Sequence, residues 1–291
     1  MDKAAREELK KRREEAVRLA LDSFPYERIE VVGEKALATW QDLRASRPDS
    51  SPVVIGGDDD FRRIIEGSVP WPGAPTRRTA EQILEAAERL RHPEDLKAKY
   101  SSDMARARER MTQLMRDKPS LPIPPFIEDA MSGASGTLNR EALIEAMSQD
   151  SKATLGDWPS EPMSAPEFTV ATEALSGRPL AKAQIVMFPT DDWTAIPAYL
   201  NFGNWNGCPA PEYHVAALRS WRDRFGAQLI GLSHDVMNIR VNRRPETREA
   251  ALELAREQYL YCNDIVDQGV GNLSALAAIL MAGDWWYFWW D

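Results

Sequence analysis

Polar side chains of the kinds used in acid–base catalysis are spread over the second half of the chain. Carboxylates close to a histidine can supply a general base and its electrostatic support, or the oxygen ligands of a hard metal ion. Spacing along the chain does not choose between these chemistries. The polar group comprises Asn206, His214, His234, Asp235, Glu257, Asp264, Asp267, Gln268 and Asp291. Its candidate catalytic residues are His214, Asp235, Glu257 and Asp264.

A structural role competes with each catalytic assignment. Glu257 and Asp264 share a helix face with Tyr261, and we favour a solvent-exposed edge because acidic side chains are usually exposed. His214 equally suits the edge of a core. Cys208 is close in sequence to His214, but no third member of a triad is visible, so we favour a structural cysteine. Neither a recognised metal-ligand spacing nor a nucleophile-elbow, Walker or dinucleotide motif occurs, and we expect no metal site.

The charge of the chain restricts its partners. The 36 basic and 45 acidic residues give a net charge of -9, which disfavours broad binding to nucleic acids or anionic membranes because phosphate contacts need a positive surface. No run approaches the roughly 20 apolar residues of a membrane-spanning helix, and the first residues lack the apolar core of a secretory signal. The two cysteines, Cys208 and Cys262, are too few for a disulfide framework and are predicted to be reduced. We expect a cytoplasmic location.

The first part of the chain alternates strands and helices. Residues 1–24 predict a helical lead-in, and residues 25–69 predict a β-α-β-α unit with strands near 29–32 and 52–55. This order favours parallel strands joined by a crossover helix. Residues 70–157 are expected to form a helical insertion with linkers. The predicted helices of this insertion cover 76–116, 126–131 and 139–149.

Residues 158–291 predict a C-terminal α/β domain. The predicted strands cover 183–188, 229–232 and 236–241, with the last two as a hairpin, and the predicted helices cover 211–225, 245–262 and 272–281. The chain closes with six aromatic residues at 285–290. Because strand alternation sends three rings to each face, we expect an interior strand there. The predicted fold class is α/β, with a mixed sheet and covering helices in the C-terminal domain, a small N-terminal β-α-β-α unit and a helical insertion.

Landmark residues of the C-terminal part carry a family resemblance. They are Asn204-Trp205-Asn206-Gly207-Cys208-Pro209, Trp221-Arg222-Asp223-Arg224-Phe225-Gly226-Ala227, Glu257-Gln258-Tyr259, Tyr261-Cys262-Asn263-Asp264, Gln268-Gly269 and Trp289-Trp290-Asp291. With them, residues 178–291 resemble the bacterial family called "domain of unknown function 4253", and residues 25–56 resemble the N-terminal part of longer members. The resemblance implies an α/β bacterial domain and no established reaction. Where members often have Cys-Pro-Asp, this chain has Asn263 in place of the proline and keeps the acid.

The acidic charge and the tryptophan-rich loops favour a cytoplasmic bacterial protein that binds or regulates a protein partner. An immunity or defence role suits such a domain. The predicted binding residues are Trp205, Asn206, Gln268 and Asp291. One alternative is a hydrolase or other small-molecule enzyme that uses Asp, Glu and His side chains of the C-terminal domain. The other is a structural subunit that forms a homo-oligomer through the helices of 76–116. The sequence identifies no cofactor, substrate or partner.

Two structural features separate these alternatives. An enzyme requires at least two of the candidate polar side chains to converge within hydrogen-bond reach in a concave pocket. A binding module instead predicts an exposed aromatic patch of several hundred Å².

Overall fold

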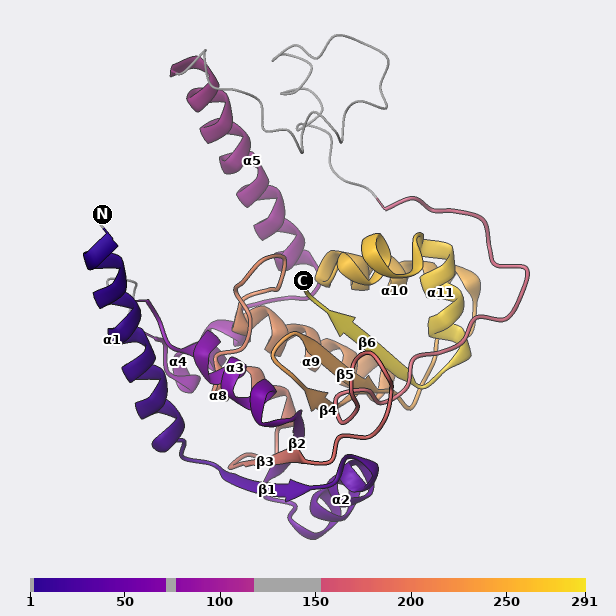
Figure 1. The fold of residues 1–291 in the computed structure, drawn as a ribbon. Coiled ribbons are helices and arrows are strands. Elements are labelled where there is room, and N and C mark those ends of the chain that lie inside the picture. Colours follow the sequence, from indigo (N-terminus) through magenta and orange to yellow (C-terminus); the bar gives the residue numbers. More distant parts are fainter. Residues whose placement is uncertain (1–2, 72–76, 118–152) are drawn as a thin grey trace. The chain divides into compact units, whose positions relative to one another are not determined.

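The computed structural model describes three stretches of the chain, residues 3–71, 77–117 and 153–291 (Figure 1). The predicted helices at 126–131 and 139–149 lie outside these described residues. None of the described helices combines the length and the apolar character needed to cross a bilayer.

The chain divides into two compact units. One unit is formed by residues 1–93 together with 154–291, and the other by residues 94–153. The second unit contains α5 (Glu94–Asp117), a charged helix in which Asp103 lies between Lys99 and Arg106 and pairs with both. All further features belong to the first unit.

The first unit contains both strands and helices. The strands are β1 (Glu27–Val31), β2 (Ser51–Gly56), β3 (Ala183–Phe188), β4 (Gln228–Leu232), β5 (Val236–Arg240) and β6 (Trp285–Trp289). The α-helices are α1 (Lys3–Asp22), α2 (Gly33–Ser46), α3 (Asp58–Ser68), α4 (Ala80–Glu88), α8 (Ile196–Leu200), α9 (Pro211–Phe225), α10 (Arg248–Tyr261) and α11 (Leu273–Ala282). Two shorter helical segments are η1 (Trp193–Ala195) and η2 (Ile265–Val270).

The six strands form one mixed sheet in the order β1-β3-β2-β4-β5-β6. Neighbouring strands are antiparallel except β2 and β4, which are parallel. The mixed α/β architecture expected from the sequence is confirmed. The predicted hairpin is also confirmed, because β4 pairs with β5 across a short turn.

The sheet joins two segments that the sequence analysis assigns to separate units. β1 and β2 come from residues 25–69 and flank β3, which comes from residues 158–291. β2 also pairs with β4, so it lies inside the sheet between two strands of the C-terminal segment. Burial explains this position, since every residue of β2 is buried.

Helix ends follow local sequence signals. Pro211 occupies the first turn of α9, and Gly226 ends this helix in the left-handed conformation at φ 59°. The side chain of Thr247 accepts a hydrogen bond from Ala250 N, so α10 begins three residues after Pro245, which the sequence analysis takes as its start.

Both faces of the sheet are covered. On one face, Ala36 and Trp40 of α2 pack with Val54 and Ile185 of the sheet. The other face carries an aromatic cluster in which the ring of Trp221 stacks on that of Phe288 with 5.3 Å between centroids. The further rings of this aromatic cluster belong to Tyr261, Trp286 and Trp290.

The expectation of an interior aromatic strand is wrong, because β6 is at the edge of the sheet. Its alternate side chains do differ in burial: Trp286 and Phe288 are buried, whereas Trp285 and Tyr287 are half-buried. An irregular segment provides the missing cover, since Phe168 packs on the Trp285 ring with 5.7 Å between centroids. Cover for both faces therefore does not require a neighbouring strand on both sides.

Candidate functional site

The parallel pair in the sheet brings two turns together. β2 and β4 run in the same direction, so their carboxyl ends lie at the same edge of the sheet. β2 leads through Gly57 into α3, and β4 leads into the turn that precedes β5. In open α/β sheets, this edge is where ligands usually bind.

His234, in the turn after β4, is held by charged side chains from α3 and from its own turn. Its Nδ1 lies 3.0 Å from Asp60 Oδ1, and its Nε2 lies 2.8 Å from Arg63 Nη1 and 3.2 Å from Asp235 Oδ2. Asp235 is oriented in turn by the hydroxyl of Ser233, which donates to Oδ1 at 2.9 Å. The residue pair expected from the sequence, a histidine beside Asp235, is thus present together with two partners from α3.

The contacts select one form of the neutral His234 ring. A guanidinium has only donors, so in the neutral ring Nε2 accepts from Arg63 and the ring proton is on Nδ1, where it is donated to Asp60. The contact of Nε2 with Asp235 Oδ2 becomes a hydrogen bond only when the ring is protonated. Asp60 is itself fixed because its Oδ2 accepts the backbone N–H of Gly57 at 2.9 Å. A carboxylate that orients an imidazole in this way also stabilises the imidazolium form when a proton is taken up.

A pocket of about 190 Å³ opens beside His234. Its lining residues are Arg63, Ile64, Gly67, Asn201, Phe202, Trp205 and His234. Trp205 is half-buried and packs edge-on against Phe202 with 4.9 Å between ring centroids. The pocket therefore combines two aromatic walls with one guanidinium and one imidazole.

Buried His214 shapes the loop that carries Trp205. His214 Nδ1 lies 2.5 Å from the hydroxyl of Tyr261, and Nε2 lies 3.3 Å from Cys208 Sγ. Burial lowers the pKa of His214 to about 3, so the ring is neutral. Burial also raises the pKa of Cys208 well above its usual value, so this residue is a thiol and not a thiolate nucleophile. His214 and Cys208 therefore have a structural role.

Gly203 explains why the loop fits so closely over His214. Its φ of 107° is a conformation that other residues rarely adopt. A Cβ at this position would lie 2.0 Å from Pro209 O and 2.7 Å from His214 Nε2.

A second group of predicted residues gathers at the other end of the same loop. The side-chain amide of Asn206 donates to the carbonyl oxygen of Asp291. Asp264 accepts from Asp291 N at 3.1 Å and from Gln268 Nε2 at 3.0 Å. Both Asp264 oxygens thus hold protein groups, and the four residues fasten the loop to the end of β6.

Glu257 lies in a buried ion-pair network and does not line the pocket. Its carboxylate accepts from Trp221 Nε1 at 2.6 Å and from Arg224 Nη1 at 2.8 Å, and it lies 3.1 Å from His92 Nε2. Burial by itself would raise the pKa of Glu257, but hydrogen bonds from His92 and Arg224 outweigh burial and lower it. Nδ1 of His92 has no partner among the described residues. The arrangement is that of a structural carboxylate.

Two members of the site, Asp60 and Arg63, are not among the residues predicted from the sequence. Asp60 is one of three consecutive acids in the first turn of α3, where acidic side chains complement the helix dipole. A weak signal exists, since the two residues are three apart on a helix that follows a Gly-Gly turn and so share a face. Nothing local links them to His234, which is 174 residues from Asp60.

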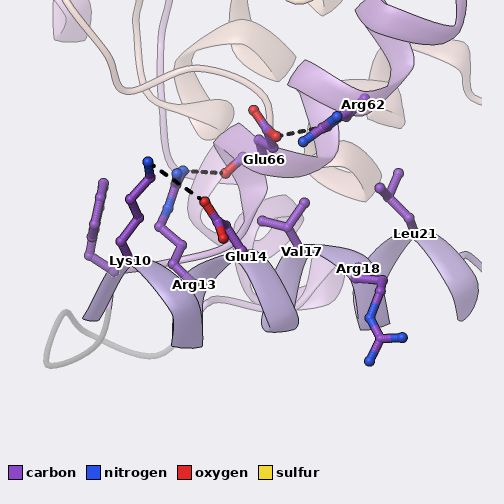
Figure 2. A pocket seen from close by; sticks show the side chains of 9 residues that line it. Lys10, Arg13, Glu14, Val17, Arg18, Leu21, Arg62 and Glu66 are labelled. Carbon is purple, nitrogen blue, oxygen red and sulfur yellow. Dashed lines mark hydrogen bonds and ion pairs between the residues drawn. The ribbon is translucent and has the colours of Figure 1, made fainter. Parts of the chain in front are cut away.

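A second hollow lies between α1 and α3 (Figure 2). Its volume is about 580 Å³, and its lining residues are Lys10, Arg13, Glu14, Val17, Arg18, Leu21, Arg62, Glu66 and Trp71. Arg13 lies over the Trp71 ring at 4.4 Å from the centroid and donates to the carbonyl oxygen of Glu66 at 2.9 Å. We call this hollow the α1–α3 groove.

The residues described by the structure contain no cluster of three His, Cys, Asp or Glu side chains that could hold a metal ion.

Comparison with known proteins gave one match, to a protein family. The model of the family described as Domain of unknown function (DUF4253) matches residues 184–291. Neither the curated proteins nor the solved structures contain a match to the chain. The matched segment includes Trp205 and His234, whereas Asp60 and Arg63 lie outside it. The C-terminal part of this chain, residues 184–291, therefore belongs to the DUF4253 domain family.

Proposed function

We propose that the protein is a hydrolase that acts on a small ester, with His234 as its general base. The observation that carries the proposal is the Asp60–His234 pair, whose imidazole lines the pocket. The imidazole Nε2 takes a proton from water, and the water oxygen forms a bond to the acyl carbon. The ester C–O bond then breaks, and the imidazolium returns its proton to the leaving alcohol. Asp60 stabilises the imidazolium between these steps.

Two criteria favour this function over the protein-binding loop expected from the sequence. Asp235 and a histidine converge within hydrogen-bond reach beside a pocket, as an enzyme requires. The loop around Trp205 offers less to a protein partner, because Trp205 is half-buried and Asn206 is bonded to Asp291.

The test compares hydrolysis of 4-nitrophenyl acetate by the wild type and three variants. His234→Gln is expected to lower kcat/KM by about 10²- to 10⁴-fold, since general-base catalysis contributes this much. Asp60→Asn should lower kcat/KM as well, whereas its exposed neighbour Asp59 provides a matched control, and Asp59→Asn should have no effect. Equal activity of His234→Gln and the wild type would refute the proposal.

A second candidate function, binding of an acidic protein partner, is favoured by the α1–α3 groove. Trp71 is 55% exposed in it, and the glutamates Glu14 and Glu66 are each paired with a basic residue of the groove (Figure 2). Two more arginines line the same groove, so its basic groups outnumber its acidic ones.

A pull-down from native cells tests this second function. The baits are the wild type, Trp71→Ala, and Leu175→Ala as a control for loss of an exposed apolar side chain. A stoichiometric partner that is lost only with Trp71→Ala supports the groove, and a partner that all three baits retain refutes it.

A further inference from the structure

Among the residues described by the structure, Arg63 is the one Lys or Arg side chain that lines the pocket beside His234. Among the described residues it forms no ion pair with a carboxylate, although its neighbour Arg62 pairs with Glu66 at 3.0 Å. Its one hydrogen bond in the described part of the chain goes from Nη1 to His234 Nε2. A guanidinium has five N–H donors, so most of its capacity is unused by the protein.

The same contact occupies the atom that must accept a proton during hydrolysis. While Arg63 donates to Nε2, the lone pair of this nitrogen is not available to water. The guanidinium of Arg63 therefore competes with water for Nε2. A stronger acceptor that draws the guanidinium away would leave Nε2 free.

A carboxylate or phosphate is such an acceptor. Two anionic oxygens can take two parallel N–H donors of one guanidinium, and this pairing is stronger than a bond to a neutral nitrogen. An anion bound to Arg63 would release His234 Nε2 toward the rest of the ligand. Binding and activation of the base are then one event.

The remaining walls limit the size and charge of the ligand. A volume of about 190 Å³ corresponds to only about six water molecules, so it takes a small molecule. Phe202, Trp205 and Ile64 offer apolar contact. Asp60 and Asp235 flank His234 and disfavour a second anionic group at that end.

We infer that the substrate of this site is a small ester that carries one carboxylate or phosphate group, and that Arg63 both anchors this group and releases His234 when it binds. The inference rests on the proposed function for its chemistry, whereas the binding event that it describes can be observed without turnover.

The experiment follows the ring nitrogens of the three histidines by NMR in protein labelled with ¹⁵N-histidine, with His234→Gln to assign the His234 signals. The probes are benzoate, phenyl phosphate and the neutral benzyl alcohol. We expect benzoate or phenyl phosphate to shift the Nε2 signal of His234, and benzyl alcohol to leave it unchanged. The response to each anion shows whether a carboxylate or a phosphate is preferred.

Two arginine variants complete the test. In Arg63→Gln the His234 Nε2 signal should already be displaced without ligand, and the affinity for the anion should fall at least about tenfold. Arg62→Gln, the matched control, should behave as the wild type. Unchanged anion affinity in Arg63→Gln, or no response of His234 to saturating amounts of either anion, would overturn the inference.

Kinetics separate this inference from the proposed function. With 4-nitrophenyl succinate, whose free carboxylate can reach Arg63, Arg63→Gln should lower kcat/KM at least about tenfold. Hydrolysis of the neutral acetate by the same variant should increase, because the guanidinium no longer occupies His234 Nε2. Arg63-dependent anion binding without hydrolysis of either ester would refute the hydrolase and leave the anion site in place. Hydrolysis that depends on His234 and not on Arg63 would refute the anion site and leave the hydrolase in place.

Discussion

The buried imidazole of His214 makes the stability of the protein depend on pH. Its pKa is about 3 in the folded protein and 6.5 in the reference state. Because the folded pKa is lowered, the unfolded chain takes up the proton first as the pH falls. The stabilisation is complete above pH 6.5 and decreases toward pH 3, by about 1.4 kcal/mol for each pH unit.

The size of the effect can be worked out for an accessible pH range. Between pH 7.5 and pH 5, protonation of the unfolded His214 lowers the free energy of unfolding by about 2 kcal/mol. Other groups also titrate with acid, so the informative quantity is the difference between the wild type and His214→Gln. This variant removes the titrating ring and retains a polar amide. It should lose about 2 kcal/mol less than the wild type over the same range.

Urea unfolding followed by tryptophan fluorescence at several pH values measures this difference. His214→Gln is expected to be less stable at pH 7.5, because the Tyr261 hydroxyl loses its imidazole partner. Cys208→Ala is the control, since it removes the thiol beside Nε2 and keeps the imidazole. Its pH dependence should match the wild type. Parallel pH profiles for His214→Gln and the wild type would refute the assignment of His214 as a buried neutral ring.

Five further substitutions test the packing of the fold, each by urea unfolding. Gly203→Ala should cost about 2 kcal/mol or more because its Cβ collides with backbone, whereas Gly67→Ala, with nothing within 4 Å, should stabilise α3 by about 0.5–1 kcal/mol; the opposite order would contradict the loop geometry. Glu257→Ala should cost about 3 kcal/mol, since it leaves buried donors unpaired, and a loss below 1 kcal/mol would identify a solvated carboxylate instead. Trp290→Ala should cost about 3–5 kcal/mol and half-buried Trp289→Ala less than half as much; equal losses would contradict their different burial.

Much of the local structure could be predicted from the sequence. The α9 helix begins at Pro211 and ends before Gly226, as its first-turn proline and terminal glycine indicate. The hairpin of β4 and β5 follows from two apolar runs around a polar turn. Such signals depend on residues a few positions apart, and the backbone responds to them wherever the segment lies in the fold.

The environment of single polar side chains was harder to predict. The residues around His214 and Glu257 in the sequence do not distinguish them from exposed residues. In the structure both are buried, and they bond to Tyr261 and Trp221. The helix pattern predicts that Glu257 and Asp264 share a solvent-exposed helix face, but this prediction is wrong, because α10 ends at Tyr261 and Glu257 is buried. Asp264 follows the end of α10 and accepts hydrogen bonds from the backbone of Asp291 and the side chain of Gln268.

The types of element, most helix ends, the aromatic segment at 285–290 and the family of residues 184–291 could be recognised without coordinates. The fold was needed to place β2 between β3 and β4, to put β6 at the edge of the sheet, and to bring Asp60 and Arg63 to His234. This difference follows from the range of the interactions. Helix caps and turns are set by neighbours in the chain, whereas strand order is set by the total burial of segments that can be more than a hundred residues apart. The candidate site arises from this second kind of choice.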